Sequence, residues 1–273
     1  WVGVGKTRSK AWLIIESGSK DTTEVLALPA DQPETPLVCL HAREPGVEVS
    51  IDHRPGVFYR LHNQTGPHFQ LDMRAESDNA SWQPLIAHRD DATLEGVDAF
   101  EWGLILAERS HQDAQVLLRR LELDSHHQTL LDSYIDLPET PCSQLLEDSP
   151  HFNARTLHLR EESFTRPPSW YALDLDSGVR TLLKQVPVHG SLAPEQLVSR
   201  RIWATSHDGE QVPVSVVMRA DLAGQPLPTL LYGYGAYGEA LDPWFSIARL
   251  ELLERGVAFA VAHVRGGGER GEP

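Results

Sequence analysis

The C-terminal stretch at residues 230–273, "LLYGYGAYGEALDPWFSIARLELLERGVAFAVAHVRGGGERGEP", decides the fold class of the region around it. It consists of a short apolar run, a glycine-rich loop, an amphipathic segment, and the apolar run "VAFAVAHV" that leads into a second glycine-rich loop. A continuous apolar run is typical of a strand that is buried on both faces of a parallel sheet. The stretch therefore predicts a strand–helix–strand unit of an α/β domain.

The segment between the two apolar runs has the spacing of a helix. Phe245, Ala248 and Leu252 recur at helical intervals with Leu253 beside them, and Gly256 follows as a C-cap. Upstream, residues 197–222 contain two alternating runs around an Asp-Gly pair at 208–209, which predicts a β-hairpin.

Each glycine-rich loop contains the pattern G-x-G-x-x-G. The glycines are Gly233, Gly235 and Gly238 in the first loop, and Gly266, Gly268 and Gly271 in the second. In a dinucleotide fold such glycines open the helix directly, and an acidic residue about 20 positions on binds the ribose. In the first loop, residues 239–243 separate the glycines from the helix, and the next strand ends in Arg265. Dinucleotide binding is therefore the weaker alternative.

Tyrosines make the first loop suitable for a different chemistry. Tyr232, Tyr234 and Tyr237 follow the end of the predicted strand, where open α/β sheets bind their ligands. In α/β hydrolases, the corresponding loop supplies a donor to the oxyanion hole. A tyrosine hydroxyl is suited to that role, whereas the alternative is packing between domains.

Four similar stretches precede this region. They begin at Ala11, Val57, Gly103 and Thr156, so that the period is 46, 46 and 53 residues. Each contains two strand-like runs, and further short strand-like runs such as "TPLVCLHA" and "VEVSIDH" bring each repeat to about four strands. A repeat of this size is typical of a β-propeller blade, although strands at such intervals also fit a β-sandwich.

These patterns predict two domains. Residues 1–194 are expected to form a partial β-propeller, which Trp1 enters partway round, and residues 195–273 to form the N-terminal part of an α/β-hydrolase domain. The hydrolase mechanism requires a serine on a G-x-S-x-G turn, followed by an acid and a histidine. No G-x-S-x-G occurs in the chain, so the triad is expected to lie beyond Pro273.

Composition restricts the partners. Lys and Arg total 24 against 39 Asp and Glu, and the resulting net charge of −15 argues against nucleic acid and is compatible with basic peptides. The chain contains no run of eighteen apolar residues, so no membrane span is predicted. Cys39 and Cys142 have neither zinc-site nor disulfide-framework spacing, which favours reduced cysteines and a cytoplasmic location.

No metal or cofactor is predicted from the histidines and acids. None of the 13 histidines forms an H-E-x-x-H motif, and His62 and His68 are expected in solvated loops. Glu161 and Glu162 are expected in a charged loop.

Several motifs carry a resemblance to a known family. The stretches "LLYGYGAYG", "FSIARLELLERG" and "HVRGGGERG", together with "GVGKTRSKAWLIIESGSKDTTEVLAL" and "YALDLDSGVRTLLKQ", are similar to the prolyl oligopeptidase family of serine peptidases, and within it to the oligopeptidase B group. The resemblance implies a seven-bladed propeller over an α/β-hydrolase domain. It also implies cleavage of short peptides after Arg or Lys.

The resemblance also implies roles for individual residues. Tyr234 would donate its hydroxyl to the oxyanion, and Asp242 would help to receive a second basic residue of the substrate. The family pattern has another acid two residues later, where this chain has Trp244, so a preference for paired basic residues is in question. Tyr237 and Arg265 are further candidates for lining the substrate site. The alternative is a propeller that binds a partner without catalysis.

Overall fold

A computed structural model describes residues 1–77, 80–139, 141–149 and 151–271. The chain divides into two compact units. The first unit contains Trp1–Glu108, Leu118–Ile135 and Ser149–Ala154, and the second contains Arg109–Leu117, Asp136–Asp148 and Arg155–Pro273. The division crosses two strands of one sheet, so each unit is described by itself.

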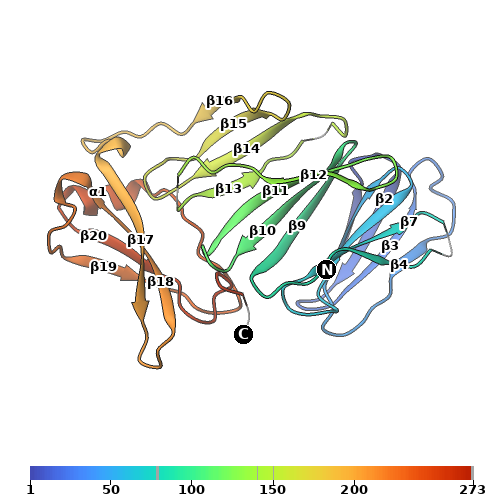
Figure 1. Cartoon of the computed structure of the whole chain (residues 1–273), viewed down its shortest axis with the longest axis horizontal. Coiled ribbons are helices and arrows are strands. Elements are labelled where there is room, and N and C mark those ends of the chain that lie inside the picture. Colours follow the sequence, from blue (N-terminus) through green and yellow to red (C-terminus); the bar gives the residue numbers. More distant parts are fainter. Residues whose placement is uncertain (78–79, 140, 150, 272–273) are drawn as a thin grey trace. The chain divides into compact units, whose positions relative to one another are not determined.

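Four antiparallel four-stranded sheets follow one another along the chain, with the strands of each sheet in chain order (Figure 1). The first contains β1 (Val2–Lys6), β2 (Trp12–Gly18), β3 (Thr23–Pro29) and β4 (Val38–His41). The second contains β5 (Val49–Arg54), β6 (Val57–His62), β7 (Gln70–Ala75) and β8 (Gln83–Ile86). The third contains β9 (Ala92–Phe100), β10 (Gly103–Ser110), β11 (Gln115–Leu123) and β12 (Thr129–Tyr134). The fourth contains β13 (Ser143–Leu146), β14 (Thr156–Glu162), β15 (Ser169–Asp174) and β16 (Arg180–Gln185).

The predicted repeat is confirmed. The four stretches identified in the sequence form the two central strands of the four sheets, from β2 and β3 to β14 and β15. The flanking runs form the outer strands, so that β4 closes the first sheet and β5 opens the second. Each repeat is therefore one four-stranded unit of the size of a propeller blade.

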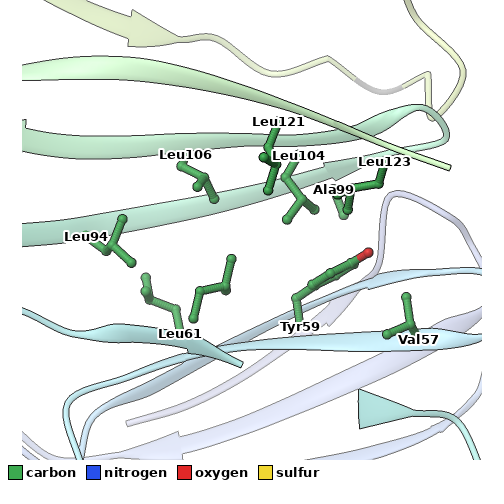
Figure 2. Close-up of a cluster of buried hydrophobic side chains, with 10 residues drawn as sticks. Val57, Tyr59, Leu61, Leu94, Ala99, Leu104, Leu106, Leu121 and Leu123 are labelled. Carbon is green, nitrogen blue, oxygen red and sulfur yellow. The ribbon is translucent and has the colours of Figure 1, made fainter. Parts of the chain in front are cut away.

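Neighbouring sheets of the first unit are held together by apolar side chains from both. Figure 2 shows Val57, Tyr59 and Leu61 of β6 directed toward Leu104 and Leu106 of β10. All five are at most 4% exposed. A single four-stranded sheet has no other way to bury this face, so the contact between sheets supplies the stability of each one.

A buried carboxylate adds a polar contact to the same unit. Asp52 of β5 accepts hydrogen bonds from the backbone N–H groups of His53, at 2.8 Å, and of Ala99 in β9, at 2.6 Å. Burial raises the pKa of Asp52 to about 6, although both hydrogen bonds and the nearby Arg8 oppose the shift. The carboxylate thus retains its proton to a higher pH in the folded chain than in the unfolded chain.

The fifth sheet belongs to the second unit and has a different topology. It contains β17 (Leu197–Thr205), β18 (Gln211–Arg219), β19 (Thr229–Tyr232) and β20 (Ala258–Ala262) in the order β17-β18-β20-β19. β17 and β18 form the predicted antiparallel hairpin, and β19 and β20 are parallel. Helix α1 (Ile247–Glu254) lies between these parallel strands in sequence, so the predicted strand–helix–strand unit is confirmed.

The buried face of α1 differs from the predicted face. Ser246 caps the helix by accepting from the backbone N–H of Arg249, and Gly256 follows the helix with φ +79°. The buried residues of α1 are Arg249, Leu250 and Leu253, whereas Ala248 is exposed and Phe245 precedes the helix. Of the expected apolar positions, Leu253 is buried and Phe245 packs against the same core, but the expectation was wrong for Ala248, and an arginine occupies a buried position that apolar periodicity excludes.

Expectations for two pairs of polar residues were also wrong. Glu161 and Glu162 lie in strand β14 and not in a loop, and the fully buried Glu161 accepts hydrogen bonds from Gln144 and Arg180. His62 lies in β6 and is 2% exposed, whereas His68 lies in a loop, as expected, but is buried and not solvated. These polar residues are buried because each has a hydrogen-bonding partner, which a single sequence does not reveal.

We expect Asp52 to give the chain a distinctive pH dependence. Between about pH 4 and pH 6 the folded chain holds a proton that the unfolded chain has released, so the free energy of unfolding falls as pH rises through this window. Asn cannot ionise. The stability of Asp52→Asn relative to wild type should therefore rise by up to about 3 kcal/mol between pH 4 and pH 7. Urea denaturation at several pH values measures this difference.

Asp31→Asn, which removes one negative charge from an exposed position, is the matched control. A stability difference between Asp52→Asn and wild type that does not vary with pH would contradict the assignment.

Candidate active site

The two glycine-rich loops follow β19 and β20, and they contact each other along their backbones. Because these strands are parallel and adjacent, their C-terminal ends lie at the same edge of the sheet. The backbone N–H of Gly238 donates to the carbonyl of Gly266 at 2.9 Å. A Cβ atom on Gly266 would lie 2.2 Å from the carbonyl oxygen of Gly235, and one on Gly268 would lie 2.4 Å from that of Gly238. Both loops therefore require glycine in order to approach each other.

This contact explains the pattern that resembled a nucleotide-binding motif. Gly235 has φ +67° and Gly266 has φ +92°, conformations that favour glycine independently of packing. The backbone of each loop occupies the space beside the glycines of the other. The glycines are thus accounted for without a phosphate group.

A buried chain of hydrogen bonds fixes the second loop to the sheet. Ser215 of β18 is 2.8 Å from Nε2 of His263, and Nδ1 of His263 is 3.2 Å from a carboxylate oxygen of Glu269. The same oxygen of Glu269 accepts the backbone N–H of Leu241 at 2.8 Å. Burial would raise the pKa of Glu269, but the hydrogen bonds from His263 and Leu241 outweigh burial and lower it. Glu269 therefore links the second loop to the segment that carries Asp242.

Sequence reasoning did not identify Ser215 or His263. Their order of contacts, serine to histidine to acid, is that of a hydrolase triad. Ser215 is only 1% exposed, however, and its oxygen also lies 3.3 and 3.2 Å from Nε and Nη2 of Arg201, both of which donate to it. A substrate carbonyl has no path to this oxygen, so the contacts have a structural role.

The three predicted tyrosines lie at the end of β19. Tyr232 and Tyr234 are 43% and 45% exposed, and Tyr237 is 82% exposed with φ +60°. The Tyr232 ring meets Trp244 edge to face, with centroids 6.2 Å apart. Within the described residues, the Tyr234 hydroxyl has no hydrogen-bonding partner and remains available as a donor.

Asp242 is held by an arginine. Both Asp242 carboxylate oxygens accept from Arg109 of β10, at 2.8 and 3.0 Å. The Arg109 side chain is 4% exposed and that of Asp242 is 33% exposed. A bidentate pair of this kind is a strong, oriented charge-assisted interaction. No sequence pattern indicated this pair, because the two residues are 133 positions apart in the chain.

Trp244 packs into a cluster of aromatic rings around a buried cation. The guanidinium of Arg249 lies 4.1 Å from the ring centre of Phe259, 4.6 Å from Trp244 and 5.3 Å from Phe164. It donates to the Trp244 carbonyl at 2.9 Å, and no carboxylate pairs with it within the described part of the chain. Burial lowers the pKa of Arg249 to about 10. Cation–π contacts thus fix the side chain of Trp244.

Arg265, the other predicted substrate residue, pairs with Asp208 in the β17–β18 turn. The two side chains are 2.6 Å apart, and that of Arg265 is 63% exposed. A cavity beside this pair is lined by both ends of the second loop, including His263, Arg265, Gly267 and Glu269. The structure therefore brings Arg265 and Glu269 to one cavity.

Two further groups bear on cofactors and redox chemistry. In the first unit, His68, His88 and Asp90 each offer one possible metal-ligating atom, and these atoms lie within 4.8 Å of one another. No sequence motif predicted this group.

In the second unit, burial, reinforced by nearby Glu161 and Glu139, raises the pKa of the Cys142 thiol to about 12, so this cysteine is unreactive.

Comparison with known proteins gives the family. The family described as "Prolyl oligopeptidase, N-terminal beta-propeller domain" matches residues 1–186. The chain belongs to the prolyl oligopeptidase family. Its fold is accordingly that of propeller blades followed by strands of an α/β-hydrolase domain, as the sequence predicts.

Relatives cover nearly all of the chain. Dipeptidyl aminopeptidase BI of Pseudoxanthomonas mexicana is 34% identical over 99% of the chain, and Protease 2 of Moraxella lacunata is 29% identical over 98%. The structure of oligopeptidase B from Trypanosoma brucei with covalently bound antipain matches 99% of the chain at 30% identity with a TM-score of 0.89. The predicted resemblance to the oligopeptidase B group is thus confirmed.

The chain spans only part of these proteins: 37% of the aminopeptidase, 38% of Protease 2 and 39% of the trypanosomal oligopeptidase. None of the helices in the described residues is sufficiently long and apolar to cross a membrane.

Proposed function

We propose that this chain forms part of a serine peptidase that hydrolyses short peptides after Arg or Lys. The observation that carries the proposal is the position of Tyr234, which follows β19 at the edge where parallel strands of an α/β sheet end and whose hydroxyl has no hydrogen-bonding partner among the described residues. In this proposal, the hydroxyl donates a hydrogen bond to the oxyanion that forms when the peptide carbonyl is attacked. Family membership supports peptide hydrolysis as the reaction.

The other predicted residues complete the proposed site. Asp242 would face a basic side chain of the substrate, and Tyr237 and Arg265 would line the approach. The exposure of Tyr237 and Arg265, at 82% and 63% of their areas, supports a role at the surface of the site. The net charge of −15 favours short basic peptides over nucleic acid as partners. No cofactor or membrane partner enters the proposal, and the proposed location is cytoplasmic.

The catalytic triad is proposed to come from the part of the complete enzyme that this chain does not span. The chain has no G-x-S-x-G turn, and it covers less than two-fifths of the compared peptidases. By itself the chain is therefore expected to be inactive. The complete enzyme is proposed to have a seven-bladed propeller, with the boundary between its domains at residues 194 and 195. The end of β16 at Gln185 and the start of β17 at Leu197 support this boundary.

A propeller that only binds a partner is the second candidate, favoured by the match of residues 1–186 to a propeller domain. A fluorophosphonate probe, which labels an activated serine, distinguishes the two. We expect stoichiometric labelling of a complete protein that contains residues 1–273, and no labelling of the 273-residue chain. An unlabelled complete protein, with no hydrolysis of peptide amides after Arg or Lys, would support the binding module instead.

Tyr234 provides a sharper test. In the complete protein, Tyr234→Phe removes the proposed oxyanion donor and should lower kcat by roughly 10²-fold or more, with KM nearly unchanged. Tyr232→Phe, at a neighbouring tyrosine on the strand itself, is the control and should have a much smaller effect. Steady-state kinetics with an arginyl amidomethylcoumarin substrate measures both. An unaltered kcat in Tyr234→Phe would remove this residue from the mechanism.

A further inference from the structure

The carboxylate that the proposed function assigns to a basic substrate side chain already has a cationic partner. Arg109 donates to Asp242 through Nη1 and Nη2, one to each carboxylate oxygen. Both residues belong to the second unit. Planar guanidinium and carboxylate groups match each other in this geometry, which makes it the most directional of ion pairs.

The burial of Arg109 makes this pairing persistent. Its side chain is only 4% exposed, so its charge loses most of its hydration, and Asp242 supplies compensating negative charge. Withdrawal of Asp242 toward a substrate would break two charge-assisted hydrogen bonds to a buried guanidinium, which is costly. The pair is therefore more stable than a surface ion pair at the same distances.

Further charges of both signs lie near the pair. Arg201 is half-buried; burial is the largest effect on its pKa and lowers it, Asp113, Asp242 and Glu269 raise it, and Arg109 lowers it. A substrate cation that approaches Asp242 meets a carboxylate whose two oxygens both already accept from Arg109, so its attraction to Asp242 is small.

The neighbouring position offers no replacement. Trp244, two residues after Asp242, is held by Arg249 and by aromatic rings and carries no charge. The only carboxylate of the motif is therefore the one that Arg109 neutralises.

We propose that Arg109 is a specificity-determining residue: by occupying the carboxylate of Asp242, it removes the preference for substrates with a second basic residue before the cleaved Arg. This inference rests on the proposed function. Removal of the guanidinium would free Asp242 to bind that second basic side chain.

The test uses the complete protein that contains residues 1–273 and two blocked substrates, Z-Arg-Arg-amidomethylcoumarin and Z-Gly-Arg-amidomethylcoumarin. The quantity measured is the ratio of their kcat/KM values. Arg109→Gln should raise the Arg-Arg to Gly-Arg ratio by about tenfold or more, which is the effect of one newly available close charge pair. The double variant Arg109→Gln/Asp242→Asn should return the ratio to that of wild type. Arg219→Gln, which breaks an exposed pair with Asp221, is the control and should leave the ratio unchanged.

An active Arg109→Gln enzyme with an unchanged ratio would overturn the inference, as would a gain that persists in the double variant. Wild-type protein that hydrolyses neither substrate would contradict the proposed function instead. If Arg109→Gln fails to fold, as judged by circular dichroism, Asp242→Asn alone decides the question. Because Asp242 is already neutralised, this variant should change the ratio by less than about threefold, whatever its effect on the rates, and a tenfold fall would overturn the inference.

Discussion

The backbone contact between the two glycine-rich loops is the constraint on which the proposed site depends. Parallel pairing of β19 with β20 brings both loops to one edge of the sheet. There the loops approach so closely that a single methyl group on Gly266 would overlap the Gly235 carbonyl. The loop that carries Tyr234 and Tyr237 is thereby positioned by the loop that carries Arg265 and Glu269.

Buried polar groups extend this positioning away from the loops. Glu269 connects His263 to the backbone of Leu241, and the next residue, Asp242, is held by Arg109. Such groups are stable in the interior because each has its hydrogen-bonding partners. The segment from the first loop to helix α1 is therefore fixed by charge-assisted hydrogen bonds at Leu241 and Asp242, and by cation–π contacts at Trp244.

Periodicity and turn chemistry were sufficient to predict the strands, the four repeats and the strand–helix–strand unit, because these depend on local patterns of apolar residues and glycine. The interior of the site was not predictable in the same way. Arg249 is buried among aromatic rings, and Glu161 is buried against Gln144 and Arg180. Arg109 meets Asp242 across more than 130 residues of sequence. In each case burial depends on a partner that the hydropathy of the residue itself does not reveal, so hydropathy alone gives the wrong environment.

The central claim is that the glycines serve the contact between the loops, and a matched pair of alanine substitutions tests it most directly. Gly266 and Gly209 have nearly the same φ, +92° and +91°, but a Cβ atom on Gly209 would meet nothing within 4 Å. Both alanines carry the same backbone strain, so their difference isolates the steric contact. We predict that Gly266→Ala lowers the free energy of unfolding by about 1–3 kcal/mol more than Gly209→Ala does in urea denaturation. Equal losses in the two variants would contradict the account.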